Sequence, residues 1–78
     1  MERWLYESLL SLSWGNSVQF GEIRGFKLWS ALGAWLEANK VRYNCTPIGS
    51  GMRVVHVFTI DGRDAGRLGR ILNKVELI

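Results

Sequence analysis

Residues 27–40 carry the pattern that most constrains how this chain can fold. Wound at about 3.6 residues per turn, the segment gathers its large apolar side chains into one broad arc: Leu28, Trp29, Ala31, Leu32, Trp35, Leu36 and Ala38. An apolar arc this wide must be covered by other elements. The pattern therefore predicts the core helix of the domain.

The opposite side of this helix is nearly flat, because it carries Ser30, Gly33 and Ala34. Gly33 costs about 1 kcal/mol relative to alanine in the middle of a helix. It indicates either the close approach of another backbone or a tolerated local defect, and the defect is the favoured interpretation. The flat side could also accept a partner helix, or the same helix of a second copy, so a homodimer is one expectation.

Two strands follow and meet at Gly49-Ser50-Gly51. A three-residue loop there would pair Ile48 with Met52 and Asn44 with His56. In that register the side chains that face the core helix are predicted to be Val41, Tyr43, Cys45, Val55 and Val57. A shift of one residue would exchange the two faces, so this assignment depends on the length of the loop.

The remaining segments complete a single two-layer α+β domain over residues 1–78. Residues 2–13 are predicted to form a first helix, and residues 18–24 an irregular strand at a sheet edge. Pro47 lacks an N–H group and favours an outer strand. Asp64 is the expected N-cap of a last helix over residues 65–75. The predicted order is helix, strand, helix, β-hairpin, helix, with a two- or three-stranded antiparallel sheet.

In outline, this order resembles a winged helix-turn-helix over about residues 2–60, with residues 27–40 in the place of the recognition helix. Residues 17–25 leave little room for the usual middle helix. Ser30, Gly33 and Ala34 stand where side chains that read base edges would be Arg, Asn or Gln. The resemblance is one of element order and does not assign the chain to the family.

Residues suited to catalysis or metal binding are few. His56 is the only histidine and Cys45 the only cysteine. We interpret His56 as a hydrogen-bonded or surface residue, because a catalytic base needs an orienting partner, and Cys45 as a small core residue. The carboxylates match no metal-ligand spacing, and Gly49-Ser50-Gly51 lacks the lysine of a phosphate-binding loop. The sequence predicts a non-enzymatic protein with no catalytic residues, no cofactor and no metal.

The same composition bears on location. No apolar run approaches the roughly 18 residues that a membrane span requires, and the acidic residues near the N-terminus do not fit a secretory signal. A single cysteine cannot form an intrachain disulfide, which suits a reducing compartment. We therefore expect a soluble cytoplasmic protein with no membrane partner.

Positive charge is concentrated in the second half of the chain. Of the net charge of +3, all lies in residues 41–78. On the predicted last helix Arg63, Arg67, Arg70 and Lys74 fall within about 60° of one another. We predict that this basic stripe, flanked by Arg42 and Arg53, contacts the backbone of nucleic acid, either DNA or RNA. A solvated helix face with its charge near the favourable C-terminal end is the simpler explanation.

The rival hypothesis is a protein-interaction module that docks on an acidic protein surface. An adaptor or inhibitor of the kind that phages carry would fit this description. Trp14, Trp29 and Tyr6 exceed what one small core needs, and aromatic residues are frequent interface anchors. The two hypotheses differ in salt dependence, because phosphate contacts weaken steeply with salt and a hydrophobic interface does not.

Overall fold

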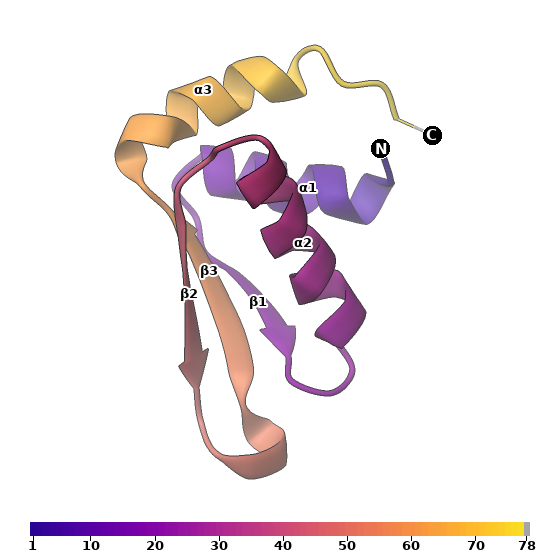
Figure 1. Ribbon diagram of the computed structural model, residues 1–78, viewed down its shortest axis with the longest axis vertical. Helices are drawn as coiled ribbons and strands as arrows, with labels where there is room; N and C mark the ends of the chain where they lie inside the picture. Colours follow the sequence, from indigo (N-terminus) through magenta and orange to yellow (C-terminus); the bar gives the residue numbers. More distant parts are fainter. Residues whose placement is uncertain (78) are drawn as a thin grey trace.

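The computed structural model describes residues 1–77 and confirms the predicted α+β architecture (Figure 1). Its elements are α1 Arg3–Ser13, β1 Val18–Gly21, α2 Phe26–Ala38, β2 Tyr43–Ile48, the short 3-10 turn η1 Gly51–Arg53, β3 Val55–Ile60 and α3 Gly62–Leu72. The strands form one antiparallel sheet in the order β1-β3-β2. Both β1 and β2 are therefore edge strands, as the sequence predicted.

The strand β1 is shorter than predicted. It pairs with β3 from Val18 opposite Phe58 to Gly21 opposite Val55. Residues 22–25 then turn directly into α2, so the middle helix of a winged helix-turn-helix does not form. The turn is tight at residue 25, where a Cβ atom would lie only 2.7 Å from the Gly21 carbonyl oxygen, so only glycine fits there.

The hairpin register differs from the predicted one. Ile48 lies opposite Val55 rather than Met52, a displacement of three residues, and His56 lies opposite Pro47 rather than Asn44. The cause is the loop, which spans residues 49–54 and contains η1. Because the displacement is an odd number of residues, the two faces of β3 are exchanged. His56, Phe58 and Ile60, rather than Val55 and Val57, share a face with Tyr43 and Cys45.

The core lies between this face of the sheet and the helices. Its fully buried side chains are Leu9, Leu12, Leu32, Leu36, Val41, Phe58, Leu68 and Leu72. Each helix contributes a leucine pair spaced three or four residues apart, which places both members on one side. Phe58 is the aromatic centre, with Tyr43 stacked on its ring at 5.7 Å and Phe20 edge-on at 6.1 Å between ring centroids.

The flat side of α2 is not its outer side. Gly33 is buried, and a Cβ atom there would lie 3.1 Å from the Tyr43 hydroxyl oxygen. That hydroxyl donates a hydrogen bond to Glu37 at 2.9 Å. Gly33 therefore allows a tyrosine ring to approach the helix, and its interpretation as a tolerated defect is wrong. The neighbouring Ser30 and Ala34 are exposed beside the ring.

The helix α3 lies across the end of the molecule opposite the hairpin turn and packs on α1 (Figure 1). Its N-cap is Asp61, whose carboxylate accepts a hydrogen bond from the Arg63 N–H at 2.9 Å. The helix thus begins three residues earlier than predicted, and the assignment of Asp64 as its cap is wrong. It also ends at Leu72 rather than at residue 75, so Lys74 lies in the turn that follows the helix. Asp64 is instead buried in the first turn.

Candidate functional site

The four cations predicted to form one stripe on the last helix have different surroundings in the structure. Arg63, Arg70 and Lys74 are exposed, whereas Arg67 is half-buried. The stripe therefore contains one residue with a structural role inside the fold and three that are open to a partner.

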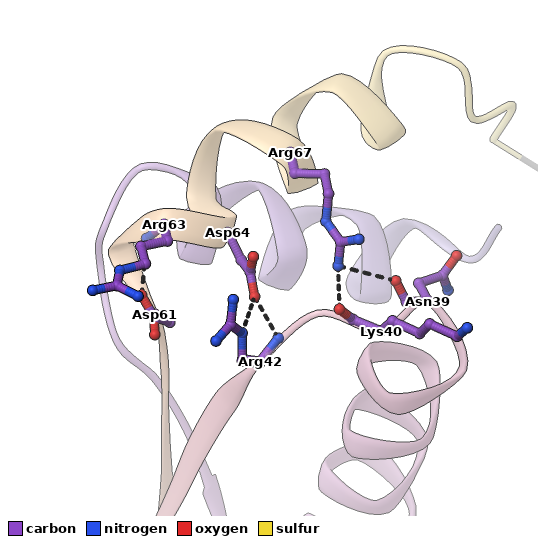
Figure 2. Close-up of polar contacts among 7 residues, drawn as sticks. All are labelled: Asn39, Lys40, Arg42, Asp61, Arg63, Asp64 and Arg67. Atoms are coloured by element: carbon purple, nitrogen blue, oxygen red, sulfur yellow. Dashed lines mark hydrogen bonds and ion pairs between the residues drawn. The ribbon is translucent and has the colours of Figure 1, made fainter.

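Arg67 binds the C-terminal end of α2 (Figure 2). Its guanidinium group donates hydrogen bonds to the Lys40 carbonyl oxygen and, at 3.3 Å, to the Asn39 carbonyl oxygen. The carbonyl groups at a helix C-terminus lack partners within the helix and carry partial negative charge. Lys40 has a positive φ of 56°, which turns the chain out of the helix. Arg67 therefore caps α2 from another helix.

Asp64 joins α3 to the start of β2, one helical turn away from Arg67 (Figure 2). Its side chain is only 10 % exposed, accepts a hydrogen bond from the Arg42 backbone N–H at 2.8 Å, and lies 3.4 Å from the Arg42 Nε atom. The backbone hydrogen bond from Arg42 is the main cause that lowers the pKa of Asp64 below its ordinary value of 3.8, and the charges of Arg42 and Arg67 add to it. The Arg42 side chain remains 69 % exposed.

The exposed cations have no carboxylate partner within residues 1–77. In this part of the chain Asp64 pairs with Arg42, and the Glu22 carboxylate is hydrogen-bonded to His56. Arg70 and Lys74, together with Arg67, line a shallow hollow of about 450 Å³ that also includes Ile71 and Val75. This hollow combines positive charge with apolar surface, so it suits an anionic group rather than a cation.

The two flanking arginines lie at opposite ends of the molecule. Arg42 stands at the start of β2, beside α3 (Figure 2). Arg53 belongs to η1 in the hairpin turn, which lies at the far end from α3 (Figure 1). The structure therefore brings Arg42, but not Arg53, to the surface formed by the cations of α3.

His56 has neighbours that the sequence did not reveal. Its Nε2 atom pairs with the Glu22 carboxylate, and its Nδ1 atom lies 3.8 Å from the Cys45 sulfur. Cys45 is exposed, so its interpretation as a core residue is wrong. Only the hairpin register places Cys45 diagonally next to His56, and the wrong loop length concealed it.

Comparison of the chain with known protein families, with curated proteins and with solved structures gives no match. Within residues 1–77, no group of three or more His, Cys, Asp or Glu side chains is arranged to hold a metal ion. No helix in the same part of the chain is long and apolar enough to cross a membrane.

The capping role of Arg67 predicts a difference between two arginines on the same helix. Arg67→Gln should lower the free energy of unfolding by about 2 kcal/mol, because it removes charge-assisted hydrogen bonds to two carbonyl groups. The matched change Arg70→Gln should alter it by no more than about 0.5 kcal/mol, because Arg70 is exposed. Urea denaturation of the two variants measures both values. Equal stability of the two variants would contradict the capping role.

The lowered pKa of Asp64 predicts a dependence of stability on pH. Because the folded-state pKa lies below the ordinary value of 3.8, the carboxylate stabilises the fold above that value, and this contribution is lost as the pH falls through the folded-state pKa. The stability difference between the wild type and Asp64→Asn should therefore shrink as the pH is lowered from about 6 to about 3.

Urea denaturation at several pH values measures this difference. Asp61→Asn is the control, since asparagine caps a helix as well as aspartate does. A difference between wild type and Asp64→Asn that stays constant over this pH range would show that the carboxylate charge is not what stabilises the contact.

Proposed function

We propose that this protein binds the phosphate backbone of nucleic acid through the exposed cations of α3. The observation that supports this is that Arg63 and Arg70 of α3, and Lys74 two residues beyond its last residue, are exposed and have no carboxylate partner within residues 1–77. Cations held in this way attract anions, and each one that neutralises a phosphate releases a condensed counterion. In this proposal the protein acts by binding and not as an enzyme.

The spacing of these cations suits a row of phosphates. Arg63 and Arg70 are seven residues apart within α3, which corresponds to about 10 Å along the helix axis. A strand of duplex DNA presents about three phosphates over that length. Arg42 adds a further cation beside α3, although Asp64 partly compensates its charge. The row can therefore follow the backbone with several contacts at once.

We propose that this binding is independent of base sequence. The helix α3 contains no Asn or Gln, the side chains that read adenine in the major groove, and the proposal assigns its exposed arginines, which can also read guanine, to phosphate contacts. Contacts to phosphate fix the position of a protein on nucleic acid but carry no sequence information. DNA and RNA are both suitable partners on these grounds. The cytoplasmic location belongs to the same proposal and rests on the single unpaired cysteine.

Docking on an acidic protein surface, as an adaptor or inhibitor, is the second candidate. Two observations favour it: Ile71 and Val75 line the hollow beside the cations, and Trp14, at the end of α1, is 71 % exposed. Exposed aromatic side chains, and apolar side chains next to arginines, are typical of protein interfaces. Such an interface would depend far less on salt than phosphate contacts do.

The nucleic-acid proposal predicts the effect of reversing two charges on α3. The double variant Arg70→Glu and Lys74→Glu should bind a labelled DNA duplex at least about 10-fold more weakly than the wild type at low salt. Fluorescence anisotropy measures the affinity, and circular dichroism confirms that the variant is folded. Undiminished affinity would exclude α3 as the binding surface.

A control variant distinguishes the effect of the α3 surface on DNA affinity from the effect of the net charge of the protein. Arg53→Glu together with Lys27→Glu changes the net charge by the same amount, but Arg53 lies in the hairpin turn and Lys27 in the first turn of α2. This control should retain most of the wild-type affinity. An equal loss in both variants would mean that overall charge, rather than the α3 surface, determines binding.

A further inference from the structure

We propose that Cys45 is a reactive thiol, activated by His56 and oriented through Glu22, that exchanges with low-molecular-weight disulfides in the cleft between α2 and β2. This proposal goes beyond the binding of an anionic partner and does not depend on it. It rests on three side chains from the turn after β1, from β2 and from β3.

The two nitrogen atoms of His56 have different partners. Nε2 meets the Glu22 carboxylate, which can only accept a hydrogen bond, so in the neutral imidazole this contact places the proton on Nε2. Nδ1 is then the unprotonated nitrogen, and it lies 3.8 Å from the Cys45 sulfur. A carboxylate that fixes the tautomer and leaves the other nitrogen facing a nucleophile is the arrangement by which a histidine activates a thiol.

The imidazole is held in this position by its surroundings. The His56 side chain is only 14 % exposed, and the Trp29 indole stacks on it with ring centroids 4.2 Å apart and planes inclined by 22°. Contacts on a ring face and at both nitrogens restrict its rotation. Glu22 is placed by its backbone N–H, which donates to the Val54 carbonyl oxygen at 2.9 Å. The base is therefore preorganised toward Cys45.

The sulfur needs such a base. Partial desolvation of the sulfur by its neighbours raises the pKa of the Cys45 thiol, so the sulfur keeps its proton near neutral pH. The thiolate, not the thiol, is the nucleophile. Transfer of the proton to Nδ1 of His56 produces the thiolate beside an imidazolium, whose charge is balanced by Glu22. The other titratable groups of the cleft, Tyr43 and Glu37, are hydrogen-bonded to each other.

The space beside the sulfur is a cleft that can hold a small molecule. It has a volume of about 330 Å³, and its walls include Ser30, Gly33 and Ala34 of α2 and Tyr43, Cys45 and Phe58 of the sheet. The small exposed side chains of Ser30 and Ala34 leave the cleft open on the α2 side. A volume of this size lies at the lower end of the range for small-molecule sites, so the cleft can hold a small disulfide.

The exchange reaction is balanced without any further reactant. The Cys45 thiolate attacks one sulfur of the disulfide, a new S–S bond forms at Cys45, and the original S–S bond breaks. The departing thiolate takes the proton that His56 received. Because the chain contains no second cysteine, no internal thiol can displace the attached group. The mixed disulfide therefore persists until an external thiol removes it.

The single cysteine also provides the reference for the test, since the same thiol can be measured in the unfolded chain. The rate of reaction with dithiodipyridine is followed by absorbance near neutral pH, for the folded protein and for the protein unfolded in urea. The rate of glutathione with and without urea shows how urea itself affects a free thiol. We expect the folded protein to react at least about 10-fold faster, since a positioned base contributes at least that much. A folded protein that reacts no faster than the unfolded chain overturns the proposal.

Two sets of variants separate activation from accessibility. His56→Gln should reduce the folded-state rate to about that of the unfolded chain, and an unchanged rate in a folded variant overturns the role of His56. Glu22→Gln should lower the rate several-fold, whereas Glu22→Asp, which keeps the carboxylate, should retain more of it; equal rates exclude a positioning role for the charge.

A separate experiment tests the exchange itself. After incubation of the protein with glutathione disulfide, intact-mass measurement should detect one added glutathione, and its absence overturns the exchange.

Discussion

The hydrogen bonds between α3 and the segment that joins α2 to β2 hold the helices and the sheet together. Arg67 donates to the carbonyl groups at the end of α2, and Asp64 accepts the Arg42 N–H at the start of β2. The two side chains are one helical turn apart and opposite in charge, so they hold both ends of a four-residue connection (Figure 2). A buried charge is tolerated only where it is paired and hydrogen-bonded, so this connection has little freedom to rearrange.

The same hydrogen bonds fix the orientation of the proposed binding surface. Leu68 and Leu72 bury the inner side of α3 in the core, and the Arg67 and Asp64 contacts fix its rotation about its own axis. Arg63 and Arg70 are then presented outward in fixed positions on the helix, and Lys74 follows in the turn just beyond its end. A row held on a rigid helix loses little conformational entropy when it meets a row of phosphates, which favours binding. The cleft at Cys45 lies between α2 and β2, away from this row, so the thiol chemistry and the binding surface are separate properties of one fold.

Much of the fold could be predicted from local patterns. The 3.6-residue periodicity identified the helices, including α2 with its buried Leu32 and Leu36, and Pro47 identified an edge strand. The hairpin register could not be predicted, because it depends on a loop whose 3-10 turn has no distinctive sequence. The same error concealed the contact of Cys45 with His56. The charge pattern of α3 showed four equivalent cations, whereas the structural role of Arg67 depends on carbonyl groups 27 and 28 residues away in the chain. Gly33 was misjudged for the same reason, because the Tyr43 ring that covers it belongs to another element.

The central claim is that α3 presents its exposed cations to a phosphate backbone, and the salt dependence of DNA binding tests it most directly. Anisotropy titrations of the wild-type protein with a labelled duplex at several salt concentrations give the slope of log affinity against log salt. Neutralisation of about three phosphates predicts a slope near −3, since each contact contributes about −0.9. A slope near zero, or no binding at low salt, would contradict the account and would favour a protein partner for the same surface.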